Sequence, residues 1–186
     1  IGHARKNIVT LRFLITAELE QRGVLSPAGL AVFLGNFIFL ICLYSVAFSF
    51  LVIPKSTIHS DTLTYVSKLI LGFCFYYFFA DIISRATSIL ACSKGILKSY
   101  SVNPILIPFA SVLTSALIFS LHLMVWFIFT KICNIKIELD YAVFILVTFQ
   151  FCVLGCFFSY FISALGIIFD KINLFSPAIN LMFLFF

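Results

Sequence analysis

Few side chains in this 186-residue sequence carry groups that do chemistry, and they form no familiar catalytic set. Cys152 and Cys156 lie four residues apart, so a helix puts both thiols on one face, where thiolates can bind a soft metal. No His, Asp or Glu joins them, which favours two small packing residues. His122 precedes Trp126 by one helical turn. A proton relay through His122 needs a carboxylate from another helix; the sequence points to none, so packing or a neutral hydrogen bond is favoured.

Basic side chains form a second group of candidates. Arg85, Lys94 and Lys98 fall within one short polar segment. They suit two kinds of partner, the carboxylates of another protein or phosphate groups, and their charge does not separate the two. Arginine binds either group bidentately, so Arg85 is our first choice for a specific contact.

The densest aromatic cluster of the chain, which holds 25 Phe in all, comes shortly before this basic segment. Its members are Phe73, Phe75, Tyr76, Tyr77, Phe78 and Phe79. Aromatic faces stack on the apolar C–H surfaces of sugar rings without fixing their orientation, so a polymer could slide across them. The alternative is lipid-facing bulk and an interfacial aromatic belt. Near-consecutive helical positions cannot all face one channel, and we favour Tyr76 and Tyr77 with a subset of the Phe residues as channel-lining.

The elements that must position these groups are membrane helices. The chain is 63% apolar and only 10% charged, whereas soluble domains carry about 25% charged residues. This composition excludes a soluble enzyme and a disordered segment. The net charge of +5 comes from 12 scattered Lys and Arg, which is too sparse for nucleic acid. The six cysteines show no paired pattern of a disulfide framework. The sequence starts without Met and stops inside an apolar run, as part of a longer polypeptide would.

The apolar runs predict an all-α, polytopic membrane protein. Residues 1–26 mix charged and apolar side chains and predict a cytoplasmic interfacial helix that ends before Pro27. The rest, 27–186, is predicted to be a transmembrane domain. Its spans are expected at about 29–53, 63–83, 105–130 and 141–169, with the start of a fifth at 172–186. Lys68 and Asp81 stand near opposite ends of the second span, where both are expected to snorkel toward headgroups; a role in a permeation path is the alternative.

The distribution of Lys and Arg predicts the orientation, because cytoplasmic loops are enriched in both. Eight fall on the side of the N-terminus and four on the other, which places the N-terminus in the cytoplasm. The cytoplasmic segment 84–104 has helical periodicity, with Ala86 and Ile89 on one arc and Thr87, Lys94 and Lys98 on the opposite side. We expect an amphipathic helix that either lies on anionic lipid or docks a cytoplasmic partner.

Several blocks of the sequence resemble the permease subunits of ABC-2 type polysaccharide exporters, the proteins that export lipid-linked O antigen, teichoic acid or capsular polysaccharide. The resemblance extends over essentially the whole chain, in family order and spacing. Its blocks are Arg22–Gly29 (RGVLSPAG), Ile83–Leu90 (ISRATSIL), Gly95–Lys98 (GILK), Val102–Pro104 (VNP), Leu106–Leu117 (LIPFASVLTSAL) and Leu165–Ile172 (LGIIFDKI).

The resemblance implies a six-span, channel-forming subunit of the bacterial inner (cytoplasmic) membrane. Such a subunit pairs as a homodimer and engages two separate nucleotide-binding subunits, which hold the ATP and Mg²⁺. The sequence contains no phosphate-binding loop of its own, so we expect a transport subunit that is not itself an enzyme and holds no cofactor. The resemblance also implies that the aromatic cluster lines the glycan path. It further implies that four residues contact the ATPase or a substrate phosphate: Arg85, Ser88, Lys94 and Lys98.

Two other functions remain open. The first is an exporter of the same fold for a small molecule or drug. The second, which is less favoured, is an intramembrane enzyme that modifies a lipid or glycan, because acidic, basic or metal-binding residues would have to converge from several spans and few are present.

Overall fold

A computed structural model describes residues 2–52, 59–92, 104–135 and 140–168, together with 177, 178 and 180. The rest of the predicted fifth span lies outside the described residues. So do positions 93–103 of the predicted amphipathic segment, which include Lys94 and Lys98.

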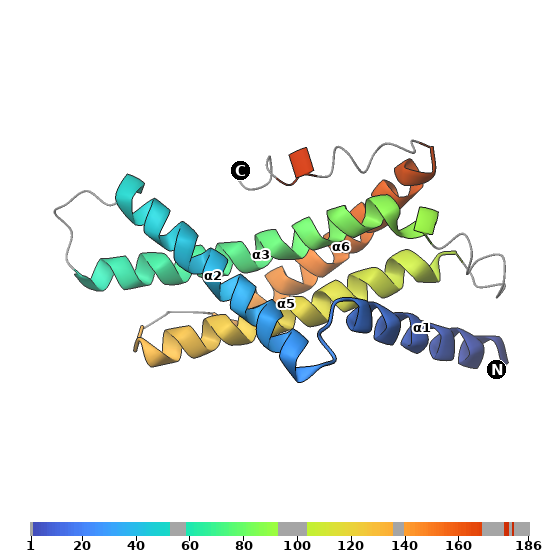
Figure 1. Ribbon diagram of the computed structural model, residues 1–186, viewed down its shortest axis with the longest axis horizontal. Helices are drawn as coiled ribbons and strands as arrows, with labels where there is room; N and C mark the ends of the chain where they lie inside the picture. The colour runs from blue at the N-terminus through green and yellow to red at the C-terminus, as the bar shows by residue number, and fades with distance from the viewer. Residues whose placement is uncertain are drawn as a thin grey trace.

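The described residues fold almost entirely into helices (Figure 1). They are α1 (Gly2–Gln21), α2 (Pro27–Val52), α3 (His59–Cys92), α5 (Leu106–Ile132) and α6 (Tyr141–Ile168). Within the described residues, three stretches are long and apolar enough to cross a membrane, Leu63–Thr87, Leu106–Ile132 and Tyr141–Gly166, and α2 adds the shorter apolar stretch Pro27–Leu43. The expectation of an all-helical membrane protein is confirmed.

The turn between α1 and α2 is closed by residues with specific backbone roles. Gly23 adopts φ 71°, a left-handed conformation that terminates helices and that glycine adopts without strain. Its N–H bonds to the carbonyl of Glu20, and the N–H of Val24 bonds to that of Leu19. The Ser26 hydroxyl then accepts a hydrogen bond from the Gly29 N–H at 3.1 Å, which caps α2. The turn therefore fixes where α1 leaves the bundle.

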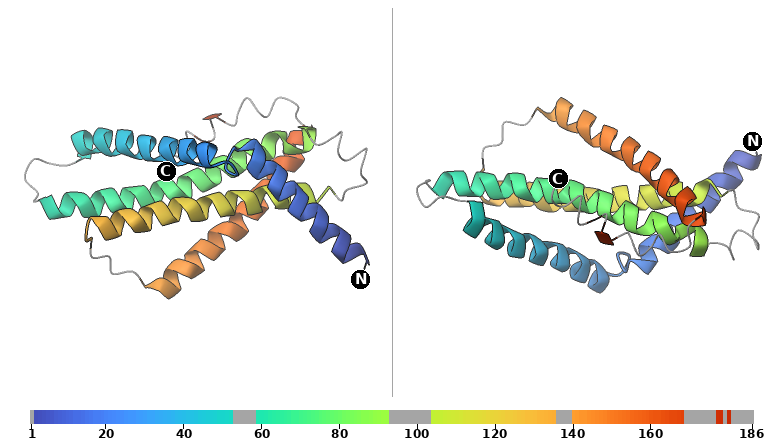
Figure 2. Two further views of the ribbon diagram at one scale, coloured as in Figure 1. Left: turned by 60° about the horizontal axis from the view of Figure 1, so that its bottom comes forward. Right: turned by 90° about the horizontal axis from the view of Figure 1, so that it is seen from above.

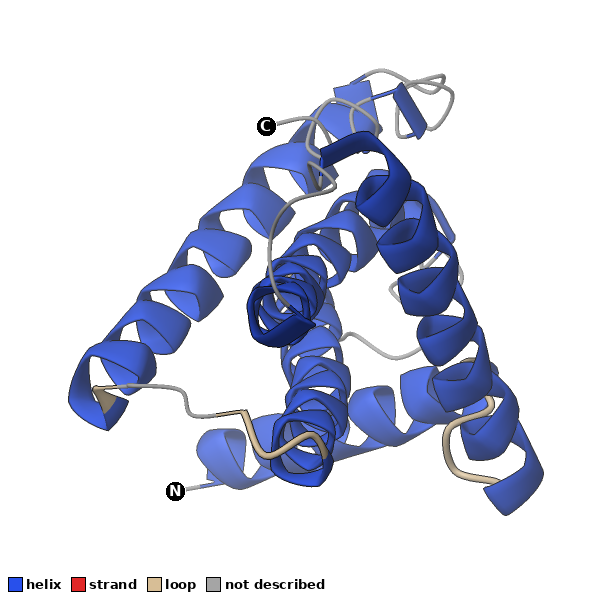
Figure 3. Ribbon diagram, turned by 90° about the vertical axis from the view of Figure 1, so that its left-hand side faces the viewer, coloured by secondary structure: helices blue, strands red, loops and turns tan. Residues whose placement is uncertain are grey.

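Helices α3 and α5 form the centre of the bundle, and α2 and α6 lie on opposite sides of this pair (Figures 2 and 3). Helix α1 projects from the end of the bundle at which α3 finishes. The first half of α6 diverges from its neighbours, and Ile145 and Phe149 there are exposed. Its second half closes onto α3, so the described helices pack most tightly toward the end where α1 is attached.

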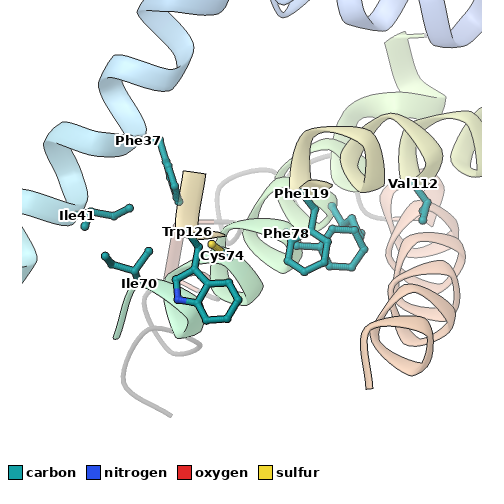
Figure 4. Packing of buried hydrophobic residues seen from close by; sticks show 9 residues of the cluster. Phe37, Ile41, Ile70, Cys74, Phe78, Val112, Phe119 and Trp126 are labelled. Carbon is teal, nitrogen blue, oxygen red and sulfur yellow. The ribbon is translucent and has the colours of Figure 1, made fainter. Parts of the chain in front are cut away.

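The hydrophobic core connects α2, α3 and α5 (Figure 4). Phe37 and Ile41 come from α2, and Trp126 from α5 is 1% exposed. The indole Nε1–H of Trp126 donates to the Ser67 carbonyl at 2.9 Å and lies 3.1 Å from the Ser67 hydroxyl. This pairing satisfies a buried polar group that would otherwise weaken the core.

We expect Trp126→Phe to lower the free energy of unfolding by about 1–2 kcal/mol, because the ring packing is largely kept while the hydrogen bond is lost. Ser67→Ala should cost less than about 1 kcal/mol, since the backbone carbonyl remains as an acceptor. Thermal unfolding of the detergent-solubilised protein measures both. Equal losses for the two variants would contradict the assigned bond.

Helix α3 does not end where the second span was expected to end, near residue 83. It continues without interruption to Cys92, so positions 84–92 of the predicted surface segment extend the same helix. The assignment of Thr87 to a polar face was wrong. Thr87 and Ala86 are both buried, because α6 packs over them and the Thr87 hydroxyl donates to the Ser84 carbonyl at 2.9 Å.

Two glycines allow this close approach of α6 to α3. A Cβ on Gly166 would lie 2.6 Å from the backbone oxygen of Thr87, and one on Gly155 would lie 2.8 Å from Cδ1 of Ile82. The first obstacle is backbone and the second is the end of a flexible side chain. Gly166 is therefore the stricter of the two contacts.

Candidate functional site

A cluster of charged side chains lies at the tightly packed end of the bundle, centred on Asp81 of α3. One carboxylate oxygen of Asp81 accepts a hydrogen bond from Arg22 Nη1 at 2.7 Å and another from the Ser115 hydroxyl. The other oxygen accepts a bond from Arg85 Nε at 3.0 Å. Two arginines thus share one carboxylate, and the cluster links the α1–α2 turn to α3 and α5.

Arg22 is the most enclosed member, with its side chain 3% exposed against 27% for Asp81 and 33% for Arg85. Its Nη2 lies 3.3 Å from the Ser115 hydroxyl and 3.6 Å from a Glu18 carboxylate oxygen. Its Nε has no hydrogen-bond partner. Burial lowers the pKa of Arg22, and Asp81 opposes that effect. The contact with Asp81 is therefore what makes this buried cation tolerable.

Glu18 lies on α1, one turn before Arg22, and its carboxylate is the least favourably placed charge of the cluster. Its pKa is raised, because burial disfavours the carboxylate more than the neighbouring Arg22 stabilises it. The folded state therefore holds a proton on Glu18 at pH values where the unfolded chain has lost it, and this contribution to stability falls as pH rises through that window.

We accordingly expect Glu18→Gln to leave the melting temperature at neutral pH unchanged or slightly higher. Lowering the pH from about 7.5 to about 5 should raise the melting temperature of the wild-type protein relative to the variant, as protonation relieves the buried charge. Thermal unfolding at both pH values measures the difference. A wild-type protein that loses stability relative to Glu18→Gln on acidification would show that Glu18 acts as a favourable ion-pair partner.

The cluster borders a cavity of about 210 Å³. Arg22, Asp81 and Arg85 line one part of it, and aromatic side chains line another. The His122 ring stacks on Phe37, with ring centroids 3.8 Å apart. His122 is buried, and its Nε2 has no hydrogen-bond partner.

The expectation that His122 packs is confirmed by these ring contacts. The interpretation that no carboxylate from another helix comes near it was wrong, because Asp81 of α3 lines the same cavity. We expected Asp81 to snorkel toward the headgroups. Instead, it binds both arginines and Ser115. Asp81 has these partners because the α1–α2 turn brings Arg22 against α3. The amino-acid sequence alone does not reveal that contact.

The aromatic cluster of α3 divides between two environments. Phe75, Phe78 and Phe79 contact rings of α5 and α6; the centroids of Phe75 and Phe119 are 5.1 Å apart, and those of Phe79 and Phe151 are 5.4 Å apart. These three rings hold helices together. Tyr77 instead contacts Phe37 of α2 and lines the cavity.

Phe73 and Tyr76 stand next to each other on α3, with ring centroids 6.4 Å apart, and Tyr76 also contacts Tyr77. Phe73 is buried, whereas Tyr76 is half-buried. Of the six aromatic candidates, Tyr77 and Phe78 border the described cavity.

Of the basic candidates, the structure brings Arg85 into the cluster. Ser88 lies on α3 with its side chain outside the described part, and Lys94 and Lys98 lie outside it altogether. Sequence reasoning missed Glu18, Arg22 and Ser115 as partners. The spacing of Asp81 and Arg85, one helical turn apart, was the available signal for an ion pair.

The cluster forms buried and partly buried ion pairs, but its described residues do not assemble a metal site. Among the described residues, no group of three or more His, Cys, Asp and Glu side chains could hold a metal ion. Cys152 and Cys156 are free thiols. Neither a protein-family model nor a curated protein sequence matches this chain.

Proposed function

We propose that this chain is the channel-forming subunit of an ATP-driven exporter of the ABC-2 type. It moves a lipid-linked surface polysaccharide, such as O antigen, teichoic acid or capsule, across the bacterial cytoplasmic membrane. Two copies form the channel, and two separate nucleotide-binding subunits hydrolyse ATP with Mg²⁺. The N-terminus lies in the cytoplasm.

The observation that carries this proposal is that the sequence blocks resembling the family meet in space. Arg22, Arg85 and Ser115 come from three of these blocks, and all three contact one another or Asp81. Gly166 comes from a fourth block and touches Thr87 of the second. Sequence blocks that are far apart in the chain but form one contact network are expected where they build a common functional region.

The continuity of α3 supports a mechanical role for that network. A single helix of 34 residues joins the aromatic cluster to the end of the membrane-spanning stretch, and a continuous helix transmits displacement along its axis. In the proposed transporter, the nucleotide-binding subunits push on the segment after α3. The shift of α3 is transferred through Asp81 to the α1–α2 turn and to α5.

The aromatic side of α3 supplies the proposed glycan path. Tyr77 borders the cavity and Tyr76 contacts Tyr77. Phe75 and Phe79 serve packing, and Phe78 packs on Phe119 as well as bordering the cavity. We therefore assign Tyr76 and Tyr77 to the glycan path, which does not require all six aromatic residues of the cluster.

Gene deletion in the source cells tests the function. The expected result is loss of a surface polysaccharide together with accumulation of its lipid-linked precursor inside the cell, restored by the wild-type gene. The Tyr76→Ala/Tyr77→Ala double variant should reach the membrane at wild-type level and restore export poorly. Immunoblots of surface glycan and extraction of the lipid-linked pool provide the measurements.

The matched control is Phe149→Ala/Phe157→Ala, which removes two exposed rings from α6 and should restore export fully. Unchanged surface glycan in the deletion strain would refute the proposal. If that strain instead became sensitive to small toxic compounds, the function would be small-molecule export.

A further inference from the structure

We propose that the cavity between Arg22, Arg85 and His122 binds an oxyanion of the phosphate class, either the headgroup of an anionic lipid or a soluble diphosphate. This inference concerns a ligand site and does not depend on the export function. It rests on unsatisfied polar atoms, on the charge around the cavity and on the space beside Arg22.

Two buried side chains on the cavity wall each have one nitrogen without a hydrogen-bond partner. The Nε of Arg22 is a permanent donor, and it is unpaired although the side chain is only 3% exposed. Nε2 of His122 is also unpaired, in a residue that is 4% exposed. Buried polar groups in native proteins are almost always satisfied, so these two atoms call for a partner that the protein chain itself does not supply.

The charge around the cavity favours an anion as this partner. Two arginines and one carboxylate line the wall, which leaves one positive charge in excess. Glu18 does not line the cavity. An oxyanion accepts several hydrogen bonds at once, and guanidinium groups bind phosphate more specifically than ammonium groups do.

The space beside Arg22 is sufficient for such a group. The first cavity measures about 210 Å³, and a shallower, more open depression shares Arg22 and Phe33 with it. Asn36 of α2 adds an amide to the wall of that depression. The first cavity therefore offers an oxyanion space next to Arg22, within a wall that also includes Arg85 and Phe33.

The test is thermal unfolding of the full chain with two probes. In detergent, sodium pyrophosphate is titrated against sodium chloride and sodium sulfate at equal ionic strength, without divalent cations. In nanodiscs, phosphatidic acid is compared with phosphatidylcholine. At about 100 times its dissociation constant, a specific ligand raises the melting temperature by about 5–10 °C. A rise with pyrophosphate assigns a soluble ligand, and a rise only with phosphatidic acid assigns a lipid headgroup.

Variants connect the shift to the cavity. Arg22→Lys keeps the charge but loses Nε, and His122→Gln leaves the ion pairs intact; each should weaken binding about 10-fold or more. Lys131→Gln, at an exposed lysine near the other end of α5, should bind like wild type. The proposal is overturned by an equal shift with chloride or sulfate, by no shift with either probe, or by wild-type affinity in both cavity variants.

Discussion

Replacing Asp81 with Asn is expected to lower the free energy of unfolding by about 3–5 kcal/mol, because breaking one side of a buried ion pair leaves the other charge uncompensated. Arg22 is nearly inaccessible and has Asp81 at 2.7 Å. Its remaining carboxylate neighbour, Glu18, is farther away at 3.6 Å. Thermal or denaturant unfolding in detergent measures the loss.

Arg22→Met should be milder than Asp81→Asn, since Asp81 would keep Arg85 and Ser115 as partners. The double variant Arg22→Met/Asp81→Leu should recover most of the lost stability, as removing both charges of a buried pair is often nearly neutral. The matched control is Glu20→Gln, an exposed charge on α1 that should change stability by less than about 0.5 kcal/mol. A near-neutral Asp81→Asn variant would show that the cluster contributes little to holding α1 and α5 against α3.

Replacing Gly166 with Ala is expected to lower the free energy of unfolding by about 3 kcal/mol, at the upper end of the usual range for overpacking. The added methyl group would lie 2.6 Å from the Thr87 backbone oxygen, and a helix backbone cannot rotate away as a side chain can. Helices α3 and α6 must then move apart. Thermal unfolding of the solubilised protein is again the measurement.

Gly72→Ala is the matched control for this contact. A Cβ on Gly72 of α3 meets nothing within 4 Å, so the substitution should raise stability by up to about 1 kcal/mol through helix propensity. Gly155→Ala should fall between the two, because the Ile82 and Phe78 side chains that it meets can adjust. Equal stability of the Gly166 and Gly72 variants would be incompatible with the close approach of α6 to α3.

These two contacts also explain why part of the site escaped sequence reasoning. Hydropathy identifies a membrane helix from its own residues, and so α5 and α6 follow from their apolar runs. The partner of Asp81 cannot be found that way. Arg22 lies 59 positions earlier, and no periodicity within α3 refers to it.

The aromatic cluster shows the same division. Its composition indicated a helix rich in rings, and helical geometry required that they face different ways. Only the packing of α5 and α6 against one side of α3 decided that Phe75, Phe78 and Phe79 join the helices together. The same packing left Tyr77, together with Phe78, at the border of the cavity.

The sequence by itself determined the helical class, the membrane setting and the approximate positions of the described apolar helices, because these depend on local hydrophobicity and on the lengths of apolar runs. The tertiary structure decided which charges meet, where α3 ends and which face of it is buried, because these depend on contacts between residues far apart in the chain. These contacts then determined the role of each charged residue. Asp81, which looked like a snorkelling carboxylate, became the group that holds two arginines at one end of the bundle.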